Sequence, residues 1–233
     1  MEPPSFWRKL LRFFGSADAP RQPIVNIKKT VSITTTDEGG QHHEYHSLDE
    51  APLELRKEIG VTITFRPHLV GGVFNAVNPS VHNSREKPIA PKVAYNKKDQ
   101  TDWARFLGIR MHYRPTVFPV NSVKAMCGCC WLEGTDQLEP FALATFDAYW
   151  GDDEDISKDD ALTSICQKAG IDPAAFFAAI NDQANKDKLR NNTQELIDRG
   201  GFGSPTMFVG GDDMYFGNDR MPLVRDAVLR RRK

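Results

Sequence analysis

Hydrophobic residues follow two different spacings along this chain, and the first of these indicates β-strands. Residues 31–36 (VSITTT) and 41–48 (QHHEYHSL) are rich in strand-forming types and flank DEGG, whose paired glycines favour a turn. This pattern predicts a β-hairpin. A short helix that opens with a capping box is predicted over residues 47–60, and the run VTITF at 61–65 predicts a further strand.

From about Lys97 the spacing changes to the three- and four-residue recurrence of amphipathic helices. Residues with known positional preferences mark several helix ends. Gly108 suits the left-handed turn that closes a helix, and Asp172 followed by Pro173 suits the first positions of another. Ser157 is a second predicted N-cap. The predicted helices cover residues 98–108, 121–134, 138–151, 157–170, 172–182, 185–201 and 218–233.

The segment GGFGSPTMFVGGDDMYFGNDRM, residues 200–221, predicts two short strands joined by a turn. Proline cannot donate to a strand ladder, so Pro205 belongs at the first residue of a strand, and Ser204-Pro205 is a step at which a cis peptide costs little. Strands near both ends of the chain with a helical block between them predict an α/β fold. We expect a thioredoxin-like core, in which a cis proline begins the third strand, split by an all-helical insertion.

Eight short motifs, in order along the chain, carry a resemblance to a known family. They are FRPHLVGGVFNAVN, PKVAY, DWARFLGI, FPVNSVKAM, AYWGDDEDIS, AGID, GGFGSPTMFVGG and FGNDRM. From about residue 61 onward the chain resembles the 2-hydroxychromene-2-carboxylate isomerases and kappa-class glutathione transferases, a DsbA-like branch of the thioredoxin superfamily. The resemblance implies that the thioredoxin-like core is of the DsbA type.

Four parts of the chain are predicted from this resemblance and from the periodicity. Residues 1–23 form an N-terminal amphipathic segment with a linker, and residues 24–74 form the first part of the core with an atypical hairpin. Residues 75–185 form the helical insertion, and residues 186–233 form the second part of the thioredoxin-like core.

The resemblance also implies a glutathione site, because family members bind glutathione in the thioredoxin groove. Ser204, just before the cis Pro205, would offer its backbone N–H and C=O to the cysteinyl part of glutathione. Asn218 and Asp219 match the pair that begins the last helix of the family, where free N–H groups suit the γ-glutamyl carboxylate. Asp219 could hold the ammonium group.

Two further positions match residues of the family site. Lys92 matches a lysine that reaches a carboxylate of glutathione or of the substrate, and Asn78 matches a family asparagine. The residues alone leave simpler explanations open: Asn218 and Asp219 as helix N-caps, Lys92 as a solvated side chain, and Pro205 as part of the fold.

The activating residue of the family, a serine followed by proline, is missing from this chain. Its expected place is residues 39–42, where the sequence reads Gly-Gly-Gln-His, so no catalytic residue can be named. His42, His43 and His46 could supply a substitute donor or a metal site, but three histidines on a polar hairpin are also expected to be solvent-exposed. No metal site is predicted.

The cysteines provide a second hypothesis. Cys127 and Cys130 form a C-x-x-C, the redox signature of thioredoxin-like proteins, but they lie inside a predicted helix rather than at its start. Buried packing is the alternative interpretation, and Cys166, on an apolar helix stripe, is expected to lie in the core. Four cysteines without a secretory signal are typical of a reducing compartment, so a cytoplasmic protein is expected.

The composition and the resemblance together lead to one favoured function. With a net charge of −1, the protein has no overall positive charge that would attract nucleic acid. The first residues are too charged for a transmembrane helix, so no integral membrane segment is predicted. The resemblance implies a glutathione-dependent isomerase or kappa-type transferase that acts on an aromatic or chromene carboxylate, in the degradation of aromatic compounds, as a homodimer. A DsbA-type thiol-disulfide oxidoreductase and a non-catalytic glutathione-binding protein remain alternatives.

Overall fold

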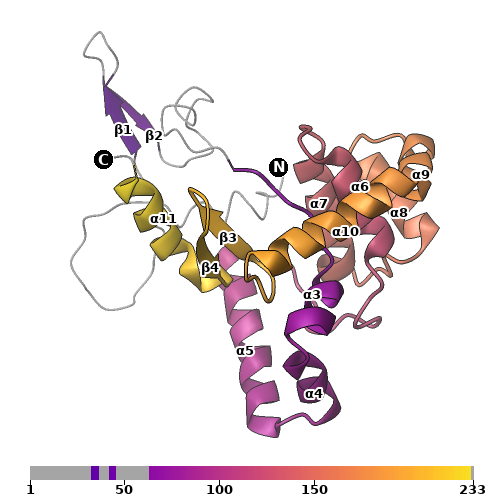
Figure 1. Cartoon of the computed structure of the whole chain (residues 1–233), viewed down its shortest axis with the longest axis horizontal. Helices are drawn as coiled ribbons and strands as arrows, with labels where there is room; N and C mark the ends of the chain where they lie inside the picture. The colour runs from indigo at the N-terminus through magenta and orange to yellow at the C-terminus, as the bar shows by residue number, and fades with distance from the viewer. Residues whose placement is uncertain (1–32, 37–41, 46–62, 232–233) are drawn as a thin grey trace. The chain divides into compact units, whose positions relative to one another are not determined.

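The computed structural model describes residues 33–36, 42–45 and 63–231 (Figure 1). Strands β1 (Ile33–Thr36) and β2 (His42–Tyr45) pair antiparallel, with Ile33 opposite Tyr45. This pairing confirms the hairpin predicted from the strand-forming residues on both sides of DEGG. The predicted helix at 47–60 and the N-terminal segment 1–23 lie outside the described residues.

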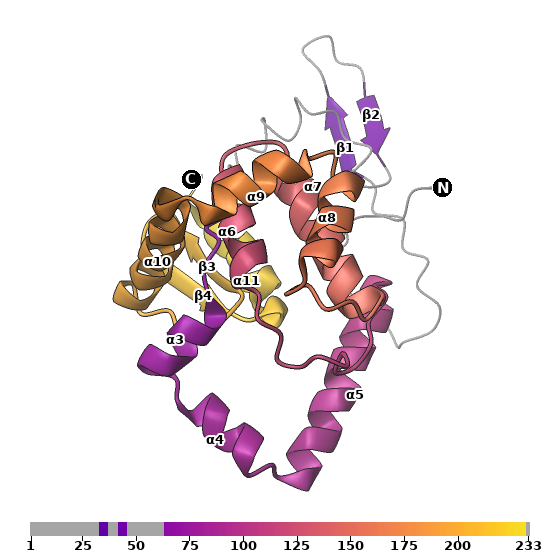
Figure 2. The ribbon, with the colours of Figure 1, turned by 90° about the vertical axis from the view of Figure 1, so that its right-hand side faces the viewer.

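Helices dominate the rest of the described chain, and two short strands follow them. The elements are α3 (Val70–Val77), α4 (Ser80–Glu86), α5 (Ala90–Leu107), α6 (Val123–Leu132), α7 (Leu138–Phe146), the π-helix η2 (Asp147–Gly151), α8 (Asp159–Lys168), α9 (Pro173–Asn181), α10 (Gln183–Asp198), β3 (Thr206–Val209), β4 (Asp213–Phe216), the 3-10 helix η3 (Asn218–Arg220) and α11 (Met221–Arg230). Figure 2 shows α6 to α9 gathered together, with α3, α4 and α5 extending away from them.

The end signals in the sequence explain several of these helices. Gly108 closes α5 in the left-handed conformation, with φ of 61°, as its lack of a Cβ allows. The Asp172 carboxylate accepts hydrogen bonds from the N–H groups of Ala174 and Ala175, and Pro173 occupies the first turn of α9. These predictions are confirmed.

Two predictions about helices were wrong or incomplete. The N-cap of α8 is Lys158, because the Ser157 hydroxyl donates to Asp155 at 2.6 Å instead of capping the helix. Helices α3 and α4 and the first turns of α5 were not predicted. Their N-caps are Leu69, Pro79 and Ile89, none of which caps with its side chain.

The strand predicted at 61–65 is wrong for its described residues, since 63–69 have no regular secondary structure. Within residues 63–231 the strands β3 and β4 pair with each other, and residues 63–69 belong to no sheet there. Strand propensity reflects packing in a sheet more than the backbone itself, and without a sheet it is not realised. Phe65 packs instead against the helical core, and Pro67 is buried.

A buried carboxylate holds the segment that precedes α3. The Glu133 side chain is 8% exposed and pairs with Arg66 at 2.8 Å and with Lys188 at 3.3 Å. Asn192 donates to Glu133 at 3.1 Å and to the Pro67 carbonyl at 3.0 Å. Burial alone would raise the pKa of Glu133, but these donors and cations hold that pKa below its ordinary value. The carboxylate therefore stays charged and ties the segment to α6 and α10.

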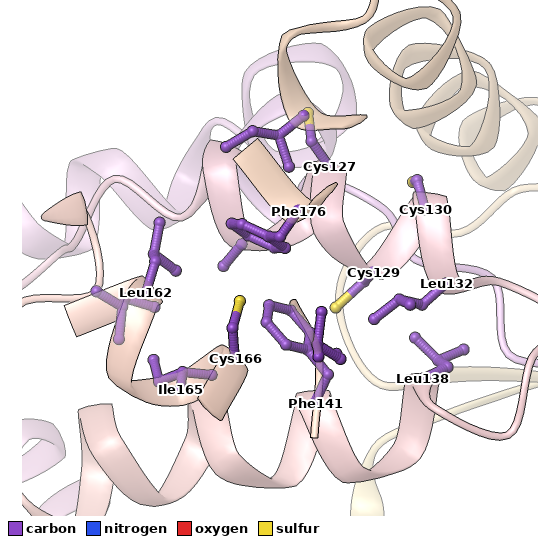
Figure 3. Close-up of a cluster of buried hydrophobic side chains, with 14 of the residues drawn as sticks. Cys127, Cys129, Cys130, Leu132, Leu138, Phe141, Leu162, Ile165, Cys166 and Phe176 are labelled. Atoms are coloured by element: carbon purple, nitrogen blue, oxygen red, sulfur yellow. The ribbon is translucent and has the colours of Figure 1, made fainter. Parts of the chain in front are cut away.

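The main core lies among α6, α7, α8 and α9 and is built around two fully buried aromatic rings. The ring centroids of Phe141 and Phe176 are 5.3 Å apart. Figure 3 shows the sulfurs of Cys129 and Cys166 directed toward these rings. Leu132, Leu162 and Ile165 are also almost completely buried, so the core belongs to the helical part of the chain.

The chain divides into two compact units. One contains residues 64–208 and 212–216, and the described part of the other contains residues 33–36, 42–45, 63, 209–211 and 217–231. The finer division into a helical insertion at 75–185 and flanking core parts remains a prediction. Among residues that the structure describes, no helix has the length and apolar character needed to cross a membrane.

Substitution of Gly128 by alanine tests the tightness of this core. A Cβ at Gly128 would lie 2.3 Å from Cε2 of Phe176, whose ring is fully buried and cannot move away. The helix propensity of alanine gains about 1 kcal/mol, whereas overpacking costs about 1–3 kcal/mol. We expect Gly128→Ala to lower the free energy of unfolding, as measured by chemical denaturation.

Gly71 in α3 provides the matched control. It is exposed, and a Cβ there would meet no atom within 4 Å. Gly71→Ala is expected to leave stability unchanged or to raise it by about 0.5 kcal/mol. Equal stability of Gly128→Ala and the unaltered protein would contradict the tight packing of Phe176 against α6.

Candidate functional site

The loop before β3 presents the Ser204-Pro205 step at the surface. The peptide bond between these residues is cis, as the sequence predicted, and both residues are exposed. The Thr206 hydroxyl donates to the Gly203 carbonyl at 2.7 Å, which folds the loop back onto the start of the strand. The backbone of Ser204 is therefore displayed on a defined turn at the entry to β3.

Two phenylalanines hold this loop against β4. The rings of Phe202 and Phe216 have centroids 4.5 Å apart. Gly203 lies under the Phe216 ring, since an added Cβ would be 2.7 Å from Cε2 of that ring. Neither phenylalanine was assigned a role from the sequence. The glycines on both sides of Phe202 were a local signal of close packing at this point.

Asn78 is brought to the same loop from a distant part of the chain. It follows α3, and its side-chain amide donates to the Phe202 carbonyl at 3.1 Å. Its amide oxygen accepts a hydrogen bond from the Ser80 hydroxyl at 2.6 Å, which fixes the orientation of the amide. Of the residues predicted for the site, Asn78 is thus the one that the structure joins to the cis-proline loop.

Asn218 and Asp219 lie in η3, the 3-10 turn that leads into α11. Gly217 precedes them with φ of 103°, and an added Cβ there would be 2.7 Å from the Asp219 carboxylate. That carboxylate pairs with the neighbouring Arg220. Asn218 and Asp219 therefore begin the last helical segment, as predicted. They belong to one compact unit, and Ser204 belongs to the other.

Lys92 occupies the first turn of α5 and is exposed. Within the described part of the chain it forms no ion pair, and no hydrogen bond connects it to the cis-proline loop. Among the residues that the structure describes, no carboxylate pairs with this ammonium group, so it is available to an anion from solution. The activating serine was expected at residues 39–42, of which 39–41 lie outside the described residues. The side chains of His42, His43 and His46 are also outside what the structure describes.

The cysteines of the C-x-x-C do not have the surroundings of a redox pair. Helix α6 begins at Val123, so Cys127 lies beyond its first turn, and the side chains of Cys127 and Cys130 are 2% and 0% exposed. Burial, reinforced by the Glu133 charge, raises the pKa of Cys130 to about 12, and burial also raises the pKa of Cys127. A reactive thiol needs a lowered pKa and access, so the interpretation as core cysteines is confirmed.

The comparisons with known proteins agree with this arrangement. Residues 45–229 match the family described as DSBA-like thioredoxin domain. A 2-hydroxychromene-2-carboxylate isomerase from Pseudomonas putida is 30% identical over 179 residues, which are 76% of this chain and 84% of that protein. A glutathione S-transferase kappa 1 from Rattus norvegicus is 32% identical over 99 residues, 40% of this chain and 44% of that protein.

A solved structure of 2-hydroxychromene-2-carboxylate isomerase superposes with a TM-score of 0.62 at 26% identity, and covers 76% of this chain and 84% of its own. The predicted fold class is thereby confirmed: the chain is a DsbA-like thioredoxin protein with a helical insertion. Within that class, it belongs to the family of the 2-hydroxychromene-2-carboxylate isomerases and kappa-class glutathione transferases.

The burial of the thiols leads to a direct chemical prediction. Iodoacetamide at pH 8 is expected to label none of Cys127, Cys129, Cys130 and Cys166 in the folded protein within an hour, because all four are buried and none has a lowered pKa. All four should be labelled in denaturant, as counted by mass spectrometry of the intact chain. Rapid labelling of Cys127 or Cys130 in the native protein would restore the redox hypothesis.

Proposed function

We propose that this protein is a glutathione-dependent isomerase that acts on a chromene-type aromatic carboxylate. The observation that carries the proposal is the exposed cis Ser204-Pro205 loop, hydrogen-bonded through Phe202 to Asn78. The names of the relatives support both the isomerase activity and the use of glutathione, since they are 2-hydroxychromene-2-carboxylate isomerases and a glutathione S-transferase.

The backbone of the loop is the first binding element. Ser204 would donate its N–H to the cysteinyl carbonyl of glutathione and accept from the cysteinyl N–H, as an added antiparallel strand does. Pro205 has no N–H and so cannot compete for these partners. Asn78 acts as a positioning residue in this scheme, because its amide already binds Phe202 and Ser80.

Charged groups would hold the two ends of glutathione. Asn218 and Asp219, in the turn that leads into α11, would bind the γ-glutamyl end, with Asp219 sharing its carboxylate between Arg220 and the ligand ammonium. Lys92, which is exposed at the start of α5, would meet a carboxylate of glutathione or of the substrate.

The bound thiolate would perform the reaction by reversible addition. Its sulfur adds to a conjugated double bond of the ring-opened substrate, which turns that bond into a single bond and places the electron pair on the conjugated carbonyl oxygen. Rotation follows, and expulsion of the thiolate restores the double bond in the other geometry. Glutathione is returned unchanged, so the reaction needs no oxidant or reductant.

A non-catalytic glutathione-binding protein is the second candidate function. The specific observation in its favour is the sequence Gly-Gly-Gln-His at residues 39–42, where the family has the serine and proline that activate the thiol. The buried cysteines give no corresponding support to a thiol-disulfide oxidoreductase. A cytoplasmic homodimer is the setting that we propose for either function.

Calorimetric titration with reduced glutathione tests the proposal. We expect binding in the micromolar to low-millimolar range, weakened about tenfold in Asp219→Ala, because a charge-assisted hydrogen bond contributes about 1.5–3 kcal/mol. Asp187→Ala is the matched control, since Asp187 is also exposed and paired with an arginine, but lies on α10. Its affinity should not change.

Turnover separates the two candidates. Absorbance assays with 2-hydroxychromene-2-carboxylate should show isomerisation that depends on added glutathione. Binding without turnover would select the non-catalytic function. No binding by any of the three proteins would remove glutathione from both candidates.

A further inference from the structure

Two arginines outside the proposed glutathione site face the same exposed aromatic ring. The Cζ atom of Arg85, from α4, lies 5.7 Å from the ring centroid of Phe118, and the Cζ atom of Arg114 lies at the same distance. Phe118 is 40% exposed and stands in the connection from α5 to α6. Figure 2 shows this connection passing from α5 toward α6, higher in the view than α4.

These arginines differ from most others in the described chain because they lack a carboxylate partner there. Seven described arginines form ion pairs: Arg66, Arg105, Arg110, Arg190, Arg199, Arg220 and Arg230. Arg85 and Arg114 instead lie over aromatic rings: the Cζ atom of Arg85 is 6.0 Å from the centroid of Phe74, and the Cζ atom of Arg114 is 6.0 Å from the centroid of Tyr113. A cation–π contact of this kind leaves guanidinium N–H groups available for a carboxylate.

The connection that carries Arg114 and Phe118 is held in place at its centre. Asp153 accepts hydrogen bonds from the Thr116 N–H at 2.6 Å and from the Thr116 hydroxyl at 2.7 Å. The Tyr149 hydroxyl donates to the Val117 carbonyl at 2.9 Å. Phe118 and Arg114 are therefore presented by an anchored loop.

Two backbone features lie at this anchor. Tyr149 belongs to η2, a π-helix, and such segments are frequent at functional sites. Arg114 has φ of 56°, a left-handed conformation that residues other than glycine seldom adopt and that clusters at ligand-binding positions. Arg114 thus lies over the ring of Phe118 from a backbone conformation that is unfavourable for a residue with a side chain.

Helix α3 connects this cluster to the cis-proline loop. Phe74, which Arg85 covers, and Asn78, which binds the Phe202 carbonyl, are four residues apart along α3 and its C-cap. Residues at this spacing lie on one face of a helix, about 6 Å apart. A ligand bound to Arg85 would therefore lie near Asn78 and the cis-proline loop that we propose binds glutathione.

We infer that Arg85, Arg114 and Phe118 form a subsite for a planar aromatic carboxylate, the substrate of the reaction. The guanidinium edges would bind the carboxylate, while the exposed face or edge of Phe118 packs against the aromatic ring. The two Cζ atoms are no more than about 11 Å apart, a span that one bicyclic carboxylate can bridge. This inference rests on the proposed function and names the residues that recognise its substrate.

Fluorescence titration with coumarin-3-carboxylate, a planar bicyclic acid, tests the subsite in the full chain. We expect saturable binding that weakens at least tenfold in Arg85→Gln and in Arg114→Gln, and several-fold in Phe118→Leu. Arg85→Lys should recover less than half of the lost affinity on a logarithmic scale, because an ammonium keeps the charge but not the fork of donors. The neutral coumarin-3-carboxamide should bind at least tenfold more weakly than the acid.

Arg190→Gln is the control, since Arg190 is an exposed arginine on α10 that pairs with Asp187. Its affinity for the probe should equal that of the unaltered protein. Equal affinity for acid and amide, or equal weakening by Arg190→Gln and Arg85→Gln, would overturn the subsite. Circular dichroism of each variant verifies that the helices are retained.

Glutathione titrations of the same variants separate this inference from the proposed function. Glutathione binding with no probe binding at millimolar concentration would overturn the subsite and leave the glutathione site standing. Probe binding that depends on both arginines, without any glutathione binding, would support the subsite and remove the glutathione-dependent reaction.

Discussion

The packing of α3 on α10 is the constraint on which both proposed binding regions depend. The Leu69 N–H donates to the Thr193 hydroxyl at 3.0 Å, and Gly72 comes so close that an added Cβ would lie 3.2 Å from Cγ2 of Thr193. Val73 is fully buried. This contact fixes the axis of α3, so the positions of Phe74 and Asn78 at its far end follow from it.

Helix α3 therefore links two kinds of chemistry, since Phe74 contacts Arg85 and Asn78 binds the Phe202 carbonyl. The cis-proline loop offers backbone hydrogen bonds, which suit a peptide such as glutathione, whereas Arg85 and Arg114 offer charge and flat surfaces, which suit an aromatic acid. An isomerase that works by thiolate addition must hold both reactants at once, and proximity of the two sites supplies much of such catalysis. Helix α4 and the connection from α5 to α6 carry the arginines, and the loop before β3 carries the backbone that would bind the peptide.

Local signals in the sequence predicted much of this structure, and the failures have physical causes. The helices from α6 onward were predicted because glycine, proline and aspartate mark their ends, as Asp172 does. The strand at 61–65 failed because strand-forming residues need a partner strand. The Ser204-Pro205 feature was predictable since a cis proline is a local property. The bond between Asn78 and Phe202 was not, because it joins positions 124 residues apart.

The central claim is that the cis-proline loop binds glutathione through its backbone. Its most direct measurement is an NMR titration of the ¹⁵N-labelled protein with reduced glutathione, observed through the backbone amides. We expect saturable shift changes concentrated at the Ser204 amide and its neighbours in residues 200–208, with smaller changes in the loop that contains Asn78. Shift changes confined to other regions, with the Ser204 amide unaffected at saturation, would contradict it.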